Sequence, residues 1–199
     1  MMATSLEQHL QHFPYKIVLA SASPRRQELL RSLGFQFSVE PSHADESFPN
    51  HLVKQDIPLY LAEKKANAFT RPLMDQELLI TSDTIVWCGN KIYNKPNDFN
   101  DAKKMLQDLS GKMHQVYTAV CLRSTKKTVL FHDESKVYFK KFKDEEIEYY
   151  LLTHKPYDKA GAYGVQDWLG YTGIEKIEGS FYTVMGLPVK PLYEHLLQF

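Results

Sequence analysis

The sequence predicts a mixed α/β fold with a mainly antiparallel sheet and a cleft. Strand-like and helix-like segments interleave along the chain, without the regular strand–helix alternation that is typical of a parallel sheet. The turn signal Gly89-Asn90 lies between two apolar runs and predicts a hairpin, which is an antiparallel connection. With 199 residues, 43% of them hydrophobic, the chain can bury a core as one domain with two lobes.

Hydrophobic pattern and capping signals predict the first elements. A short polar helix is expected over residues 5–12, and a mainly apolar strand over 15–20. Ser23 as a cap and Pro24 at the first helical position predict a helix, which Gly34 ends.

Two helices and several strands are expected in the middle of the chain. Alternation predicts a strand over 35–39, and helix-forming residues at helical spacing predict a helix over 58–69. A long strand-like run over 77–87 leads through the hairpin turn into a strand over 91–93.

The later elements are marked by helix caps and by two further strand-like runs. Asp and Asn are common N-caps, and acidic residues favour the first turn of a helix. The expected elements are a helix from Asp98 or Asn100 through Leu109, strands over 116–122 and 129–139, a helix from an Asp144 cap through His154, and, after a glycine-rich stretch, a helix over about 187–199.

Charge and cysteine content narrow the classes of protein. The 24 basic residues balance the 24 acidic ones, so the net charge favours neither a nucleic-acid scaffold nor a membrane surface. Cys88 and Cys121 lie in apolar runs and are expected to be buried thiols. No apolar stretch reaches the roughly 20 residues of a membrane span, and residues 1–13 lack a secretion signal. We therefore expect a cytoplasmic protein without nucleic-acid or membrane partners.

An anion site is predicted where the first strand meets the first long helix. Ser21 and Ser23 form a hydroxyl-rich turn, and Arg25 and Arg26 lie in the first helical turn. Arginines there face the positive end of the helix dipole, which is unfavourable unless an anion lies beside them. Backbone N–H groups, hydroxyls and guanidinium groups together match phosphate oxygens. The alternative is a pair of solvated surface arginines.

A second candidate residue is Asp83, which interrupts a nearly continuous strand pattern. Strand interiors select against Asp, and a buried carboxylate is costly unless cations or donors compensate it. The structural alternative is a bulge or a strand-edge residue. The functional interpretation is a general base or a ligand of a divalent metal, because Mg²⁺ and Mn²⁺ prefer hard oxygen ligands.

Further candidates are Lys65 and Lys95, which are able to place positive charge near phosphates. Solvated surface lysines are the ordinary alternative for both. The segment 158–166 has two glycines that permit close backbone approach, next to carboxylate, ammonium and amide side chains, although a plain structural loop fits equally well. Neither the nucleotide P-loop pattern nor the dinucleotide glycine fingerprint occurs.

Taken together, these motifs resemble those of the Maf family. The match includes Ser-Ala-Ser-Pro-Arg-Arg over 21–26, the lysine-bearing helix at 61–66, Ser-Asp-Thr at 82–84, and the segments 94–96, 109–111 and 158–166, in the same order. It extends from about residue 15 to the end, so residues 1–14 are expected to be an N-terminal extension and 15–199 a single catalytic domain.

This resemblance implies both a fold and an activity. Family members have a twisted mixed sheet flanked by helices, related to inosine triphosphate pyrophosphatases, with the nucleotide in a central cleft between two lobes. The implied reaction is cleavage of a nucleoside triphosphate between its α and β phosphates, with a divalent metal such as Mg²⁺ or Mn²⁺. The segment 158–166 resembles the branch that acts on dTTP, UTP and modified pyrimidine nucleotides, with a 7-methyl-GTP preference as the alternative.

The resemblance also assigns roles to residues. Asp83 is implied to be the proton acceptor, and Arg26, Thr84 and Gln166 are implied to select the base. We further hypothesise that Asp83 binds the metal and that the triphosphate is held by Ser21, Arg25, Arg26, Lys65 and Lys95.

Several expectations stay open. The role of the acidic pair Asp45 and Glu46 is not assigned, and a homodimer is open alongside a monomer. A different class of function is a nucleotide-binding regulator of cell division, in which binding matters more than turnover.

Overall fold

The structure is a computed structural model that describes residue 10 and residues 13–42 and 44–199. Its elements are β1 (Lys16–Leu19), α2 (Pro24–Ser32), β2 (Phe37–Val39), α3 (Asp56–Asn67), β3 (Glu77–Cys88), β4 (Lys91–Tyr93), α4 (Phe99–Leu109), β5 (Met113–Arg123), β6 (Thr128–Phe139), α5 (Asp144–His154), the 3₁₀ turn η1 (Ala160–Ala162), α6 (Trp168–Gly173), β7 (Ile174–Glu178), α7 (Phe181–Met185) and α8 (Val189–Leu197). Apart from Leu10, the polar helix expected over residues 5–12 lies outside the described residues.

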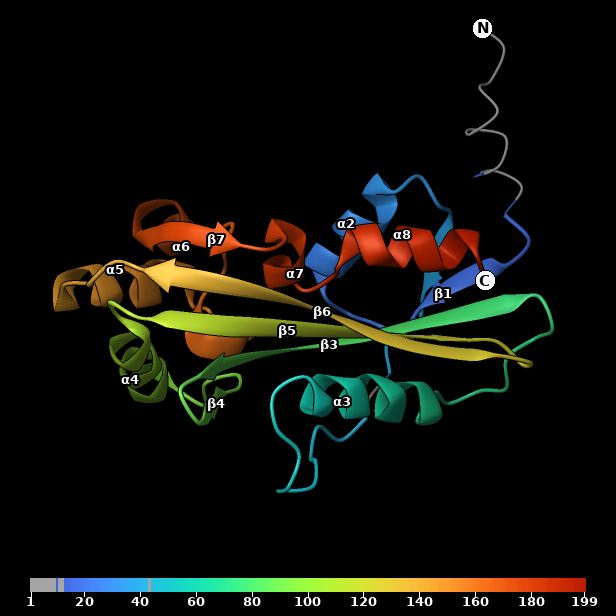
Figure 1. Cartoon of the computed structure of the whole chain (residues 1–199), viewed down its shortest axis with the longest axis horizontal. Coiled ribbons are helices and arrows are strands. Elements are labelled where there is room, and N and C mark those ends of the chain that lie inside the picture. Colours follow the sequence, from blue (N-terminus) through green and yellow to red (C-terminus); the bar gives the residue numbers. More distant parts are fainter. Residues whose placement is uncertain (1–9, 11–12, 43) are drawn as a thin grey trace, which may run out of the picture.

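One mixed sheet runs through the molecule, in the strand order β2-β1-β3-β5-β6-β7 (Figure 1). Strand β1 pairs in parallel with β2 and β3, whereas the pairs β3–β4, β3–β5, β5–β6 and β6–β7 are antiparallel. The predicted mixed, mainly antiparallel sheet is confirmed. The hairpin predicted at Gly89-Asn90 joins β3 to β4.

Alternating side chains of β3 fill cores on both faces of the sheet. Leu78 and Ile80 pack with Leu30 of α2 on one face, in a cluster to which α8 also contributes. Leu79 packs with Ala62 of α3 on the other face. Figure 1 accordingly shows α2 and α8 on one side of the sheet and α3 on the opposite side.

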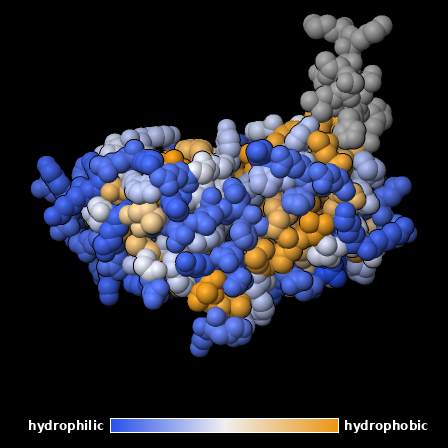
Figure 2. All heavy atoms as spheres, in the orientation of Figure 1, coloured by the Kyte–Doolittle hydropathy of each residue, from blue (hydrophilic) through white to orange (hydrophobic). Residues whose placement is uncertain are grey.

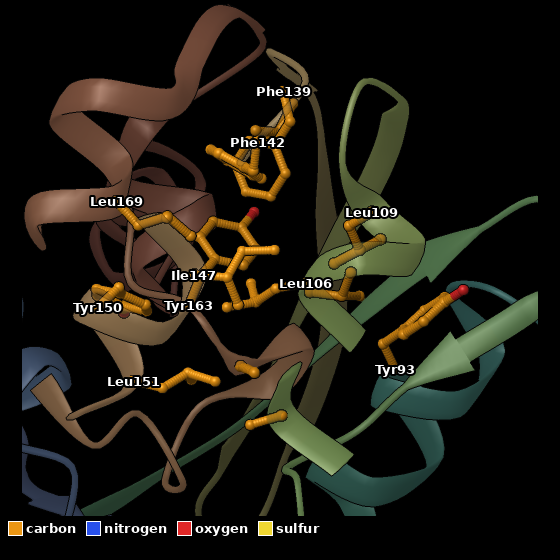
Figure 3. Close-up of a cluster of buried hydrophobic side chains, with 14 of the residues drawn as sticks. Tyr93, Leu106, Leu109, Phe139, Phe142, Ile147, Tyr150, Leu151, Tyr163 and Leu169 are labelled. Atoms are coloured by element: carbon orange, nitrogen blue, oxygen red, sulfur yellow. The ribbon is translucent and has the colours of Figure 1, made fainter. Parts of the chain in front are cut away.

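A separate core lies at the other end of the long strands. There, Leu106 and Leu109 of α4 pack in one cluster with Ile147 of α5 and with Tyr163 (Figure 3). Val86 of β3 belongs to this cluster, so the same strand contributes to both ends of the molecule. Buried clusters therefore lie at both ends of the long strands, in line with the two lobes expected from the sequence.

Some boundaries differ from those that the sequence predicts. The second predicted helix begins earlier, at Asp56, and ends at Asn67. The prediction that Asp144 caps α5 was wrong, because Asp144 is the first residue of the helix and Lys143 is the N-cap. The N–H of Lys143 donates to the Glu146 side chain, as in a capping box. Ser23 is the N-cap of α2 as predicted, although its side chain makes no capping hydrogen bond.

The glycine-rich stretch before the last helix contains α6, β7 and α7, none of which the sequence pattern predicted. The two helices have six and five residues, which is too short for a helical period to be recognised, and the five residues of β7 do not alternate strictly between apolar and polar. Within the described part of the chain, no helix is both long and apolar enough to span a membrane.

Candidate active site

A cavity of about 440 Å³ opens beside the middle of β3. Strand β3 pairs with β1 only as far as Ile80 and with β4 only from Val86, so between these two pairings the described strands leave one edge of β3 uncovered. The cavity lies against this gap. The residues that the sequence analysis singled out, Ser21, Arg25, Arg26, Lys65, Asp83, Thr84, Lys95 and Gln166, all line it.

The turn after β1 places two arginines at the cavity. The Ser21 hydroxyl accepts a hydrogen bond from the Ser23 N–H at 3.3 Å, which fixes the turn before α2 begins at Pro24. Arg25 and Arg26 therefore project from the first turn of α2, next to the N–H groups that a helix start leaves unpaired. This part of the cavity carries positive charge and free donors.

Arg26 is held rigidly. Its Nε donates to the carbonyl oxygen of Gly186 at 2.8 Å and its Nη2 donates to the Thr84 hydroxyl at 3.1 Å. Desolvation lowers the pKa of Arg26, an effect that the negative charge of Asp83 opposes. A guanidinium remains protonated despite such a shift, so Arg26 contributes a fixed positive charge.

Asp83 is a buried carboxylate, 6% exposed, in the interior of β3. The strand continues through it in regular register with β5, opposite Ala119, so the bulge considered from the sequence is absent from this pairing. Its compensation is Lys65, whose ammonium group lies 2.6 Å from Asp83 Oδ1. The cation that a buried carboxylate requires is therefore supplied by α3.

Glu46 links the two lysines of the cavity. It lies 2.9 Å from Lys65 Nζ and 2.8 Å from Lys95 Nζ. Partial desolvation raises the pKa of Glu46. The hydrogen bonds and charges of Lys95 and Lys65 outweigh this effect and lower the pKa to about 2. The sequence left the roles of Asp45 and Glu46 open. In the structure, Glu46 lines the cavity, whereas Asp45 pairs with Lys64.

The segment after α5 completes the wall opposite α2. Asp158 lies 3.3 Å from Arg25 and 2.8 Å from Lys159, and Lys159 also lies 3.7 Å from Asp167. Desolvation raises the pKa of Asp158, but the Lys159 hydrogen bond and charge outweigh it and lower this pKa. The segment 158–166, for which a plain loop was the alternative, therefore forms part of the cavity.

Gln166 lines this cavity and carries a buried polar atom without a partner among the described residues. Its Oε1 is buried and has no hydrogen-bond partner in the described part of the chain. The Tyr150 hydroxyl fixes the backbone around it, since it accepts from the Gly164 N–H at 3.1 Å and donates to Asp167 at 2.9 Å. An unpaired buried oxygen is unfavourable, so this position is suited to a ligand that donates a hydrogen bond.

Some contributors to the site were not predicted. Gly186 provides its carbonyl oxygen to Arg26 and, at 3.3 Å, to the Ser82 hydroxyl, and its φ of 109° is a backbone conformation that suits glycine. A helix-ending glycine ahead of Leu187-Pro188 was the available signal. Lys159, which supplies the ammonium group of the segment 158–166, also lines the cavity, and the sequence pattern gave it no role.

The donor set fits a divalent metal only in part. Among the residues that the structure describes, no group of three or more His, Cys, Asp or Glu side chains is arranged to hold a metal ion. Asp83 and Glu46 nevertheless both contact Lys65, so two hard carboxylates face the same position. This fits an ion such as Mg²⁺, which commonly takes one or two carboxylates and completes its shell with waters and substrate phosphates.

Comparison with known proteins gives a consistent family. The model for "Maf-like protein" matches residues 16–199. A Parabacteroides distasonis protein named "dTTP/UTP pyrophosphatase" is 53% identical over 93% of this chain and 96% of its own length, and one of the same name from Flavobacterium johnsoniae is 47% identical over 92% and 94%. Among solved structures, the Staphylococcus aureus Ham1 protein matches 62% of this chain and 71% of its own, with a TM-score of 0.44 and 13% identity. The family match and the close relatives cover nearly the whole chain, and it therefore belongs to the Maf family.

Proposed function

We propose that this chain is a nucleoside triphosphate pyrophosphatase that hydrolyses dTTP and UTP, and modified pyrimidine nucleotides, to the monophosphate and pyrophosphate. The observation that carries the proposal is one cavity that is lined by five cationic side chains, those of Arg25, Arg26, Lys65, Lys95 and Lys159, together with the buried carboxylate of Asp83. The relatives that bear the name dTTP/UTP pyrophosphatase support the choice of substrate.

The triphosphate is held by Ser21, Arg25, Arg26, Lys65 and Lys95. In the structure, Arg25 contacts Asp158, while Lys65 and Lys95 share Glu46. Phosphate oxygens carry the same charge as these carboxylates, so a bound triphosphate competes with them for the same donors. Positioning and charge neutralisation are the main contributions that a protein makes to phosphoryl transfer.

Asp83 accepts a proton from the attacking water as the α–β phosphoanhydride is cleaved and pyrophosphate leaves. Its carboxylate is positioned for this by the rigid central strand and by the Lys65 contact. A divalent ion would be held by Asp83, with Glu46 as the nearest further carboxylate, and would supply neutralisation of phosphate charge.

Base selection rests on Gln166, Arg26 and Thr84. A side-chain amide offers one donor and one acceptor group, which suits the adjacent N–H and carbonyl of a uracil or thymine ring. The free Oε1 of Gln166 is the acceptor of such a pair. Arg26 and Thr84 hold each other at 3.1 Å and thereby fix the shape of the neighbouring wall.

The decisive experiment incubates the purified chain with dTTP, UTP or 7-methyl-GTP, each with Mg²⁺, with Mn²⁺ or with a chelator, and identifies the products. We expect pyrophosphate and monophosphate from dTTP and UTP, and loss of both with the chelator. Nucleotide binding without pyrophosphate release would contradict the proposal and favour a regulator of cell division. A preference for 7-methyl-GTP would contradict the substrate assignment. A cytoplasmic location stays a prediction.

A further inference from the structure

A row of polar side chains crosses the centre of the sheet beside the cavity. Thr84 of β3 lies opposite Thr118 of β5, and Thr118 lies opposite Asp133 of β6. Thr84 lines the cavity, whereas Thr118 is fully buried and is not among the described residues that line it. A buried hydroxyl is costly unless it is hydrogen-bonded, so the contacts of Thr118 indicate what this row does.

Helix α7 lies on this row, close to α2 (Figure 1). Of its five residues only Thr183 is buried. The Thr183 carbonyl oxygen accepts from the Thr118 hydroxyl at 2.8 Å, and the Thr183 hydroxyl donates to Asp133. Figure 2, in the same orientation, shows mainly hydrophilic and intermediate atoms at the position of α7, whereas hydrophobic atoms gather between the positions of α8 and α3. A helix this short depends on tertiary contacts, so these polar bonds help to place it.

The hydrogen-bond pattern fixes the direction of both threonine hydroxyls at the centre of the row. A threonine hydroxyl has one proton to donate. Thr118 donates its proton to the Thr183 carbonyl oxygen, which accepts and cannot donate. The contact of 3.0 Å between the hydroxyl oxygens of Thr84 and Thr118 is therefore a bond in which Thr84 donates. The contact of 3.1 Å between Thr84 and Arg26 is one in which Thr84 accepts, because a guanidinium has donors only.

Thr118 also connects the two groups that hold Arg26. The Thr183 carbonyl oxygen that accepts from Thr118 accepts from the Gly186 N–H as well, at 3.1 Å. The Gly186 carbonyl oxygen and the Thr84 hydroxyl are in turn the acceptors of Arg26 Nε and Nη2. The hydrogen bonds thus close a ring, in which Thr118 joins β3 to the end of α7.

We propose that Thr118 is a positioning residue for base selection, which takes up the Thr84 proton and leaves Thr84 as a hydrogen-bond acceptor at the cavity. A hydroxyl oxygen has two lone pairs, and Arg26 uses one of those of Thr84. The second suits a base group that donates, such as the ring N–H of uracil or thymine, and disfavours a carbonyl oxygen, which is itself an acceptor. The inference rests on the proposed function, in which Thr84 and Arg26 contribute to base selection.

The first test compares the binding of two probes, one with a base and one without. The probes are α,β-methylene UTP, whose bridging carbon prevents cleavage between the α and β phosphates, and inorganic tripolyphosphate. Calorimetry measures their dissociation constants. Thr118→Val retains the branched side chain and removes the hydroxyl. It is expected to weaken binding of the UTP analogue about 2- to 10-fold, the range for loss of one hydrogen bond, and to leave tripolyphosphate binding nearly unchanged. Thr118→Ser retains the hydroxyl and is expected to bind both probes like the unmodified chain.

Further variants separate this role from a general loss of stability. Thr81→Val on β3 removes another fully buried hydroxyl, which donates to the Ala62 carbonyl oxygen at 2.6 Å, and is expected to leave the relative affinity for the two probes unchanged. Because Thr118 acts through Thr84, Thr118→Val should weaken binding of the UTP analogue no further in a chain that already carries Thr84→Val. Circular dichroism checks that each variant is folded. Equal weakening of both probes by Thr118→Val, or additive losses in the double variant, overturns the proposal.

The second test observes the hydroxyl groups directly and needs no nucleotide. Neutron diffraction from crystals of the deuterated chain is expected to place the Thr84 deuterium towards Thr118 and the Thr118 deuterium towards the Thr183 carbonyl oxygen. A Thr84 deuterium that points into the cavity overturns the proposal, whether or not the chain releases pyrophosphate. If both tests give the expected results but no pyrophosphate is released from UTP, the proposed hydrolysis fails and the role of Thr118 in binding stands.

Discussion

Lys65 is shared between two carboxylates, Asp83 and Glu46, at 2.6 and 2.9 Å. Lys65 and Lys95 are therefore paired with carboxylates of the protein itself, whereas Arg26 bonds to neutral groups. Glu46 is the partner that a phosphate group is able to replace, because it lies on a loop and its side chain is 45% exposed, whereas Asp83 is fixed in β3. We therefore expect the substrate to displace Glu46 and Asp83 to stay in place.

Replacement of Asp83 by Asn tests its role as proton acceptor. The amide keeps the size of the side chain but accepts no proton, and loss of one such group commonly costs about 10²-fold or more in rate. We expect kcat for dTTP to fall by at least that factor, while circular dichroism shows the native fold. The control is Asp108→Asn on α4, which removes a carboxylate that pairs with Lys91; this variant retains full activity. Near-normal turnover of Asp83→Asn would exclude this role.

Gln166→Glu tests base selection. The substitution removes the amide donor and adds a negative charge next to the base, while the phosphate-binding side chains stay in place. We expect kcat/KM for dTTP and UTP to fall more than that for 7-methyl-GTP, with little change in the metal concentration required. Gln198→Glu, on an exposed residue near the C-terminus, leaves these ratios unchanged. Equal losses for all nucleotides would remove Gln166 from base selection.

The sequence predicted individual site residues better than their contacts. Asp83 was recognisable because a carboxylate in a strand interior is chemically out of place, and the arginines because they lie at a helix start. The contacts of Glu46 with Lys65 and Lys95 join residues 19 and 49 positions apart, and no local pattern reports such a distance. The Gly186 carbonyl was missed for the same reason, since its partner Arg26 is 160 positions away.

At the level of elements, long strands and capped helices were predictable, whereas the wall of the cavity after α5 was not. Strand β3 is a 12-residue strand with apolar residues on both sides of its polar centre, and α4 begins after the Asp98 cap, whose side chain accepts from the Asp101 N–H. The wall after α5 depends instead on one tertiary contact, the Tyr150 hydroxyl, which is bonded to both Gly164 and Asp167. Helix α5 thereby positions the segment that carries Gln166.

Tyr150→Phe removes this hydroxyl and retains the buried ring. The Gly164 N–H then loses its acceptor, and an unsatisfied buried group costs about 1–3 kcal/mol. We expect a higher KM for dTTP and weaker discrimination among nucleotides, with kcat affected less. Tyr149→Phe on the same helix is the matched control, because Tyr149 is 50% exposed. If the two variants behave alike, or if Tyr150→Phe changes stability alone, Tyr150 does not position Gln166.

At the level of the whole molecule, one sheet connects two lobes, and the cavity lies where β1 and β4 leave β3 uncovered. The class of fold was predictable because the interleaved elements excluded a regular parallel sheet. The uncovered edge of β3 was not predictable, because it depends on where the short strands β1 and β4 stop pairing along β3.

The stability of the folded chain should depend on pH through His114, which is fully buried and contacts the Tyr163 hydroxyl at 2.7 Å. Burial lowers the pKa of His114 to about 3, below its ordinary value of 6.5. Between these values the unfolded chain binds more protons than the folded one, so the free energy of unfolding falls as the pH falls from 6.5 towards 3, by up to about 1.4 kcal/mol per pH unit.

His114→Gln removes this titration while it retains a group that can bond to Tyr163. The variant is expected to be less stable than the unmodified chain at pH 7, and the difference in unfolding free energy should shrink steadily as the pH is lowered to 4. Urea titrations at pH 7, 6, 5 and 4 measure it. His51→Gln, on an exposed histidine, provides the control and should stay parallel to the unmodified chain throughout. If the unfolding free energy of His114→Gln instead differs from that of the unmodified chain by the same amount at every pH, His114 is not the group that couples folding to protons. A change in packing alone would produce such a constant difference.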